Sequence, residues 1–424
     1  MPGNLNLHRI GGTRLAPQSA AGTAYIMTDH LEDGQAAPKE PDYLLSAQFA
    51  LLLLATAFFG LSFSAYFLLP KFLATELAAE PSTIGAVSAI TMFASVVFMP
   101  LVGIQVDRRG RKFFGCAGAL TFAVASAGYL VIDSVGPLLW VVRILQGIAF
   151  TLFYIALSTL ATEQAPPRRL GQAIGLFGAV MISTNALGPA LAEWVSGRYG
   201  WPVVFGATVV TATLSAALTL LIRERFVEHP HAESVGMLGL LRRPGLKRVL
   251  TVAVMVGWTM GGLFTFYQPW ALERGIEQVS GFLIAFAGCA MLVRTGLGGL
   301  ADRLGRMRVA TAALFFYVGV PFSLIWIDQI GLVLSGSLLG LSHGLFFPAL
   351  NAVALDFAHA RERGKAMAAY HGAFNVGFAA GSYLLGYVAM ASDYPTVFAV
   401  AGATCLSAFV LLATTAKPGV PDSG

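Results

Sequence analysis

Two short stretches of the sequence place a single carboxylate among arginines and glycines. The first is GIQVDRRGRKFFG, from Gly103 to Gly115, and the second is GGLADRLGRMRVA, from Gly298 to Ala310. Each contains Gly, then Asp-Arg, one further residue and Gly-Arg, with Asp107 and Asp302 as the acids. A carboxylate in such a setting forms ion pairs and is attracted to the positive N-terminal end of a helix. Contacts of this kind can hold two helices together and can be broken again. The sequence contains no nucleophile elbow, metal-ligand cluster or phosphate-binding loop.

The composition around these stretches is that of a membrane protein. Hydrophobic residues make up 56% of the 424 residues, charged residues make up 12%, and the mean hydropathy is +0.71. A soluble core of this size would leave too little polar surface to cover itself. The composition therefore excludes a soluble domain and indicates a chain that lies in a bilayer.

Long apolar runs recur from about Leu44 to about Thr415. A helix needs about 20 mainly apolar residues to cross the hydrocarbon core of a bilayer. The sequence therefore predicts an all-α polytopic membrane protein with 12 transmembrane helices. They are centred near Ala57, Met92, Val124, Ala149, Ile182, Ala212, Met260, Cys289, Tyr317, Ser342, Gly377 and Thr404.

The basic residues predict how the chain is oriented. Lys and Arg accumulate in short cytoplasmic loops, and alternate loops hold most of the 27 in this chain. We therefore expect both termini in the cytoplasm and the protein in the cell inner (plasma) membrane. The basic face also suits anionic membrane lipid, and a nucleic-acid partner need not be invoked. The predicted outer loops keep only Lys71, Arg198 and Arg274.

The second half of the chain repeats the first. GIAFTLFYIALSTLATE at 147–163 aligns with GLSHGLFFPALNAVALD at 340–356, and WPVVF at Trp201 aligns with YPTVF at Tyr394. Because each copy has six spans, the copies start on the same side of the membrane and form parallel repeats. We predict a disordered cytoplasmic N-terminus at 1–42, with Met27 as an alternative start, and a cytoplasmic tail at 416–424. Two six-helix bundles, 43–222 and 249–415, are joined by a cytoplasmic linker at 223–248.

These features resemble the major facilitator superfamily of transporters. The stretch from Gly103 to Lys112 is similar to motif A of that family, and RILQG, from Arg143 to Gly147, is similar to its motif B. The resemblance covers about 44–415. It implies a secondary active transporter, not an enzyme, that moves a small organic solute by alternating access. It implies no catalytic residue, metal or cofactor, and we expect a functional monomer.

The resemblance also implies a gating role for both Asp-Arg stretches. In the family, the motif A acid pairs with a loop arginine and meets the N-terminal end of span eleven, which starts here near Gly364. Gly103 is expected to allow close helix approach, and Gly110 a tight turn. The hypothesis is a latch that favours the outward-facing state, formed by Asp107, Arg108 and Arg111. Its counterpart against span five is formed by Asp302, Arg303, Gly305 and Arg306.

The candidate cavity residues lie on spans that the resemblance places around a central cavity. In span four, Arg143, Gln146, Phe150 and Tyr154 share one helix face, because their spacing is three and four residues. The equivalent face of span ten carries His343, Phe347 and Asn351. Packing is the alternative for the aromatic residues, and an interhelical hydrogen bond is the alternative for His343. Further wall candidates on spans one and seven are Tyr66, Trp258, Tyr267 and Gln268.

Three other ionisable residues are expected near the cytoplasmic surface. Arg294 is close enough to that surface for its guanidinium to snorkel. Glu163 and Asp356 end spans four and ten at the same face and are expected in a cytoplasmic ion-pair network. No Asp or Glu lies in the middle of span one, so Asp107, Glu163 and His343 are the possible proton carriers.

The cargo and the direction follow less directly from the sequence. The candidate cavity residues suit a moderately apolar or amphiphilic solute, and the first hypothesis is an exporter with proton antiport. The exporter motif C of the family is echoed only in part, because TNALGPALAEW keeps Gly188-Pro189 but has Glu193 where a Gly belongs. The alternative is an importer of a small organic anion, by proton symport or uniport, with Arg143 as the substrate anchor.

The substitution Asp107→Asn tests the gating hypothesis. Removing the charge should abolish most transport, because the carboxylate is what attracts the loop arginine and the helix end. Insertion into the membrane should be unchanged. Transport by purified protein in liposomes measures the first outcome and membrane fractionation the second. Full transport by Asp107→Asn would contradict the latch.

Overall fold

The computed structural model describes residues 44–224, 237–297, 299–359 and 362–414. The predicted N-terminal segment at 1–42, the choice between Met1 and Met27, most of the predicted linker and the tail at 416–424 lie outside the described residues. Every assigned secondary-structure element of the described part is a helix.

The first half contains six spans. The first span is broken into α1 (Ala47–Ala65), a short 3-10 turn (Tyr66–Leu68) and α2 (Leu69–Thr75). The break occurs where Pro70 enters the first turn of α2, since proline cannot donate a backbone hydrogen bond. The other five spans are α3 (Pro81–Arg109), α4 (Arg111–Gly128), α5 (Pro137–Glu163), α6 (Leu170–Tyr199) and α7 (Trp201–Leu221).

The second half repeats this arrangement after the short helix α8 (Met237–Leu241). Its first span, α9 (Pro244–Glu273), already begins inside the predicted linker. The short helix α11 (Leu300–Leu304) carries the second Asp-Arg stretch. The remaining spans are α10 (Ser280–Gly296), α12 (Arg306–Ser323), α13 (Gln329–Asp356), α14 (Arg363–Ala391) and α15 (Tyr394–Ala413).

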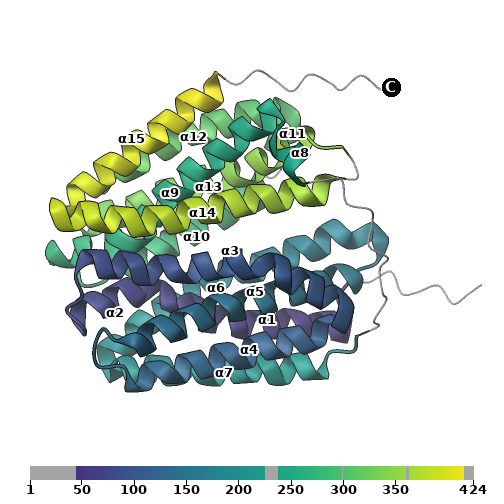
Figure 1. Ribbon diagram of the computed structural model, residues 1–424, viewed down its shortest axis with the longest axis horizontal. Coiled ribbons are helices and arrows are strands. Elements are labelled where there is room, and N and C mark those ends of the chain that lie inside the picture. Colours follow the sequence, from purple (N-terminus) through teal and green to yellow (C-terminus); the bar gives the residue numbers. More distant parts are fainter. Residues whose placement is uncertain (1–43, 225–236, 298, 360–361, 415–424) are drawn as a thin grey trace, which may run out of the picture. The chain divides into compact units, whose positions relative to one another are not determined.

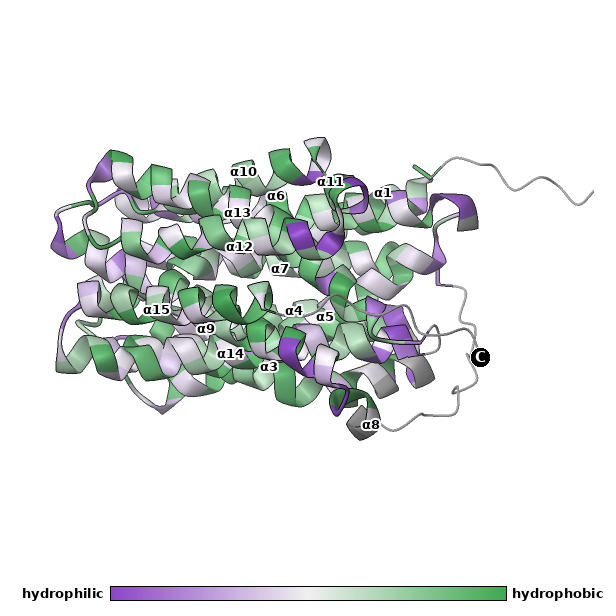
Figure 2. Ribbon diagram, turned by 90° about the horizontal axis from the view of Figure 1, so that it is seen from above, coloured by the Kyte–Doolittle hydropathy of each residue, from purple (hydrophilic) through white to green (hydrophobic). Residues whose placement is uncertain are grey.

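The twelve predicted span centres are confirmed, because each falls inside a different one of these long helices. Ten of the helices are long and apolar enough to cross a membrane by length and composition. α10 is shorter, and the first turn of α12 contains Arg306 and Arg308. Helices suit a bilayer because all their internal backbone groups pair within one segment. Hydrophilic residues gather at the helix ends in Figure 2, and most densely at the end near α8 and α11.

The helices pack in the same pairs in both halves. In the first half α1 packs on α6 and α7, α4 packs on α5 and α7, and α3 packs on α5. In the second half α9 packs on α14 and α15, α12 packs on α13 and α15, and α10 packs on α13. Each pair is the counterpart of one in the other half. The duplication seen in the sequence is therefore a duplication of the packing.

Two pairs of helices form the most extensive contacts between the halves. α3 lies against α14, as Figure 1 shows, and α6 lies against α10. Under the repeat these pairs are also equivalent, since α3 corresponds to α10 and α6 corresponds to α14. We use two names below: the Asp-Arg end is the end of the bundle with the turns at Gly110 and Gly305, and the far end is the opposite end, with Lys71 and Ser280.

Glycines allow a close crossing in the second half, between α9 and α14. A side-chain carbon at Gly257 or Gly261 would meet the backbone of Phe374 or Phe378, and one at Gly377 or Gly381 would meet the backbone of Val254 or Trp258. Both helices therefore carry a pair of glycines four residues apart, and each pair faces the other helix. Small residues at this spacing let helix backbones approach in a membrane, where van der Waals packing holds helices together.

The substitution Gly377→Ala tests this crossing. The added methyl group would overlap the Val254 backbone, which cannot move without displacing α9. We expect a loss of about 1–3 kcal/mol of stability, the usual result of overpacking, measured as a lower melting temperature in detergent. Gly372→Ala is the matched control, because a carbon added there meets no described atom within 4 Å. Equal melting temperatures for the two variants would contradict the tight crossing.

Candidate functional site

A cavity of about 1260 Å³ lies between the two halves. Its walls come from α6 of the first half and from α10, α13 and α14 of the second. In each helix the lining residues belong to the part nearer the Asp-Arg end, such as those between 171 and 182 in α6 and between 291 and 295 in α10. The lining continues to Arg169, Asp302 and Arg306 at that end. The cavity therefore opens toward the Asp-Arg end.

The lining is mainly apolar, with a few polar groups. Ile182, Met291 and Phe347 are among its apolar members, and Arg294 is a cation on α10 within it. The Oδ1 atom of Asn351 is buried and has no hydrogen-bond partner among the described residues. Apolar walls with a few polar groups are the usual form of a small-molecule site. The other polar side chains of α6 and α14 in this lining are Gln172 and His371.

An aromatic cluster forms one wall of the cavity. The Phe347 ring lies 5.1 Å from His343, 5.4 Å from His371 and 5.2 Å from Phe374, measured between ring centroids. His343 is 7% exposed, and its Nδ1 atom has no hydrogen-bond partner in the described part of the chain. His343 thus lies behind Phe347, while Phe347 itself faces the cavity. Such a wall suits the apolar part of a ligand.

Arg143 lies outside the lining of this cavity. Its Nε atom donates to the Val87 carbonyl oxygen at 3.1 Å, and its Nη1 atom donates to the Gln146 Oε1 atom at 2.8 Å. The Tyr129 hydroxyl donates to the same Gln146 oxygen at 3.4 Å. Nearby, the Tyr66 hydroxyl lies 3.3 Å from the Thr208 hydroxyl. These residues form a buried polar cluster within the first half, and the proposed role of Arg143 as a substrate anchor stays a prediction.

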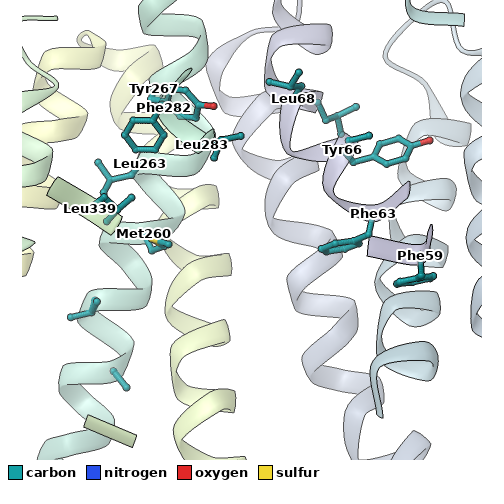
Figure 3. Close-up of a cluster of buried hydrophobic side chains, with 14 of the residues drawn as sticks. Phe59, Phe63, Tyr66, Leu68, Met260, Leu263, Tyr267, Phe282, Leu283 and Leu339 are labelled. Atoms are coloured by element: carbon teal, nitrogen blue, oxygen red, sulfur yellow. The ribbon is translucent and has the colours of Figure 1, made fainter. Parts of the chain in front are cut away.

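The other predicted wall residues on spans four and seven also lie outside the lining. Tyr154 is 38% exposed and stacks on Phe150, with ring centroids 5.5 Å apart. Tyr267 is fully buried and stacks on Phe282, with centroids 4.4 Å apart, as Figure 3 shows. Trp258 is half-buried on α9. Gln268 lies at the far end, where it joins the two halves. Of the predicted cavity residues, Phe347 and Asn351 line the cavity.

The turns of both Asp-Arg stretches have the same backbone conformation. Gly110 has a φ of 96° between α3 and α4, and Gly305 has a φ of 93° between α11 and α12. This region of φ favours glycine, so the predicted tight turn is confirmed and occurs twice. The close approach expected at Gly103 is wrong, because a side-chain carbon there would meet no described atom within 4 Å. Gly103 faces open space on α3.

One ion pair is repeated next to these turns. The Arg111 Nη2 atom lies 2.8 Å from the Glu163 Oε1 atom, and the Arg306 Nη1 atom lies 2.5 Å from the Asp356 Oδ1 atom. Each pair joins the start of the third span of its half to the end of the fourth span. The expected ion-pair network of Glu163 and Asp356 is therefore present. It links helices within each half.

The remaining gating residues are described in part. The side chains of Asp107 and Arg108 lie outside the described residues, although their backbone belongs to α3. Asp302 and Arg303 are exposed on α11, and Asp302 lies 3.6 Å from Arg306. α14 begins at Arg363, next to the predicted start of span eleven. The latch itself stays a prediction.

The comparisons with known proteins agree with this geometry. The family profile described as Major Facilitator Superfamily matches residues 51–336 and 329–423. The chain belongs to this superfamily. Its members are secondary transporters of small molecules, and the chain is accordingly a multi-pass membrane transporter.

Individual relatives are more distant. The chain is 26% identical over 332 residues to the multidrug resistance protein MdtG of Rahnella sp. (strain Y9602). The aligned region covers 74% of this chain and 79% of that protein. It is 22% identical over 327 residues to the uncharacterized MFS-type transporter MJ1560 of Methanocaldococcus jannaschii, over 74% of this chain and 84% of that protein.

Two solved structures share the fold at 16% identity. The nucleoside transporter NupG has a TM-score of 0.72 over 87% of this chain and 99% of its own. The human organic anion transporter MFSD10 (TETRAN) has a TM-score of 0.65 over 88% of this chain and 100% of its own. At 16% identity these similarities show that the fold is shared, and they carry no information on the solute.

The structure gives two residues positions that the sequence did not predict. Arg294 is expected close enough to the cytoplasmic surface to snorkel, and the structure adds that it lines the cavity that opens toward the Asp-Arg end. Glu224 was not singled out, yet its carboxylate accepts hydrogen bonds from the backbone nitrogens of Arg111 at 2.5 Å and Lys112 at 3.1 Å. It therefore caps α4 directly after the first Asp-Arg stretch. The signal for Arg294 was its membrane position; for Glu224 the sequence offers no signal.

The duplicated ion pair of the superfamily fold allows a paired prediction. Arg111 and Glu163 are 3% and 27% exposed, whereas Arg306 and Asp356 are 42% and 35% exposed. Glu163→Gln should cost about 1.5–3 kcal/mol of stability, the range for a buried hydrogen bond to a charged group. Asp356→Asn should cost no more than about 1 kcal/mol. Melting temperatures in detergent compare the two, and a larger loss for Asp356→Asn would contradict the role of burial.

Proposed function

We propose that this transporter exports a moderately apolar, amphiphilic organic solute and that the solute carries an acidic group. The observation that supports this is the position of Arg294 in an otherwise mainly apolar cavity. The guanidinium can pair with a carboxylate, phosphonate or sulfonate, while Phe347, Met291 and Ile182 contact the apolar body. Asn351 adds an amide side chain to the lining.

The side on which the cavity opens supports the proposed direction of transport. The basic residues gather in the loops of the Asp-Arg end, and such loops lie in the cytoplasm. We therefore place this end, and both chain termini, on the cytoplasmic side of the inner membrane. A cavity open to the cytoplasm is ready to load an exported solute. The multidrug resistance name of the MdtG relative is in keeping with export.

The alternative, an importer anchored on Arg143, has less support from the geometry. Arg143 is 7% exposed and already donates to Val87 and Gln146. Arg294 instead lines the cavity, beside the apolar residues that would contact the solute. We therefore assign the substrate contact to Arg294 and a structural role in the first half to Arg143.

We infer that an inward proton movement drives the export. The proton carriers open to this role are the three groups named from the sequence: Asp107, Glu163 and His343. Of the two whose side chains are described, Glu163 is paired with Arg111 near the Asp-Arg end. His343 lies in the aromatic wall beside Phe347 and is separated from the cavity by one ring.

The direct test is transport by the purified protein in proteoliposomes. A panel of amphiphilic organic acids, lipophilic cations and sugars should be compared with and without an imposed pH gradient. We expect the organic acids to accumulate best and only against the proton gradient. Preference for lipophilic cations would overturn the assignment of an acidic solute, and flux that ignores the gradient would overturn antiport.

The substitution Arg294→Gln tests the substrate contact. We expect KM for an acidic solute to rise about tenfold or more, because a charge-assisted hydrogen bond in a partly dehydrated cavity is lost. Arg294→Lys should lose less, since it keeps the charge. Arg308→Gln is the control, because it removes an exposed arginine of α12 that does not line this cavity. An unchanged KM for Arg294→Gln would contradict the contact.

A further inference from the structure

The carboxylate of Glu193 joins the two halves at the far end. Glu193 lies near the end of α6, and its two oxygens accept hydrogen bonds from the backbone nitrogens of Val279 and Ser280, each at 2.8 Å. Val279 directly precedes α10 and Ser280 is its first residue, so these nitrogens have no partner within that helix. A carboxylate from the first half thus caps a helix of the second half. The favourable charge of a helix N-terminus strengthens this contact.

Lys71 extends this contact to α2. Its ammonium group lies 2.7 Å from Glu193 Oε1 and donates to the carbonyl oxygen of Glu277 at 2.5 Å. Lys71 therefore bonds to both halves at once. The side chains of Lys71 and Glu193 are 15% and 11% exposed, so water competes little for these bonds.

Gln268 of α9 forms a second connection between the halves at the far end. Its Oε1 atom accepts from the backbone nitrogen of Lys71 at 3.1 Å, and its Nε2 atom donates to the Phe67 carbonyl oxygen at 2.6 Å. Both ends of the amide are thus used. The 3-10 turn between α1 and α2 ends at Leu68, so Gln268 bonds to backbone next to an irregular segment of the first span.

The same two helices form the cavity walls and this connection. α6 and α10 line the cavity near the Asp-Arg end and are tied together by Glu193 at the far end. The two halves can move apart at the far end only if these bonds break. They are the bonds from Glu193 to α10, from Lys71 to the Glu277 carbonyl oxygen, and from Gln268 to Lys71 and Phe67. The connection and the open cavity therefore belong to one state of the protein.

We propose that Glu193, Lys71 and Gln268 form a far-end latch that keeps the outer side closed while the cavity is open to the cytoplasm. The latch deepens the proposed function, since it rests on alternating access. It also explains why a glutamate follows Gly188-Pro189 at a position where the exporter motif has glycine. Glu193 carries the charge that a glycine cannot supply, and releasing it from α10 is a required step in opening outward.

The test measures the separation of the halves without any substrate. Spin labels are attached at Gly197→Cys on α6 and Gln278→Cys before α10, both exposed positions, and the half-buried Cys289 is replaced by Ala. Their distance distribution is recorded by electron paramagnetic resonance in lipid nanodiscs. In Glu193→Gln we expect the population with a long far-end distance to increase about fivefold or more, the lower range of a conformational coupling.

Matched variants keep the result interpretable. Glu277→Gln removes an exposed carboxylate from the same loop, where only the backbone carbonyl of Glu277 contacts Lys71, and it should leave the distances unchanged. Lys71→Met should act in the same direction as Glu193→Gln. A Glu193→Gln protein that elutes as the unmodified protein does and keeps its distances would overturn the latch.

Different experiments would contradict the latch and the proposed substrate class. If the unmodified protein moves no organic acid in liposomes, the substrate assignment falls, while the distance measurement still reports on the latch. If transport is as proposed but Glu193→Gln and Lys71→Met leave the far-end distances unchanged, the latch alone is wrong.

Discussion

The cost of placing charge in a bilayer accounts for where the charged residues of the described membrane-spanning helices lie. A charged side chain in the hydrocarbon region must meet a partner, a backbone carbonyl or water. Arg143 meets the first two within the first half, whereas Arg294 faces a cavity that reaches the helix ends. The described ion pairs lie near the ends of the helices. The apolar helices between them are thus left to pack through small residues, as α9 and α14 do through their glycines.

The duplication gives the two halves equivalent parts, and the copies differ in some of their contacts. Both halves pack their helices in the same pairs, and the pairs α3–α14 and α6–α10 join them in equivalent ways. Both halves also repeat a glycine turn and an ion pair at the Asp-Arg end. The copies differ in burial at that pair and in the residues facing the cavity. A symmetric frame with unequal contacts suits a protein that alternates between two states.

The two proposed latches rely on one type of interaction at opposite ends of the bundle. The proposed motif A latch would place a carboxylate against the start of α14 at the Asp-Arg end. The far-end contact places the Glu193 carboxylate against the start of α10. A carboxylate and a helix N-terminus bind without a shape-specific pocket, so the contact can break and form again at modest cost. Interactions of this kind are suited to gates, whereas the glycine crossings are suited to the parts that stay fixed.

The sequence by itself determined the elements of this protein: twelve spans, their duplication, the turns at Gly110 and Gly305, and membership of a transporter superfamily. Hydropathy and repeated spacing are local properties, so a chain read in one dimension contains them. Only the tertiary structure decided which polar side chains meet. It put Arg294 in the cavity and Arg143 outside it, and brought Glu193 to α10, 86 residues away. Helix rotation and the contacts between halves fix these positions, because a helix has several faces and the sequence does not state which neighbour each face meets.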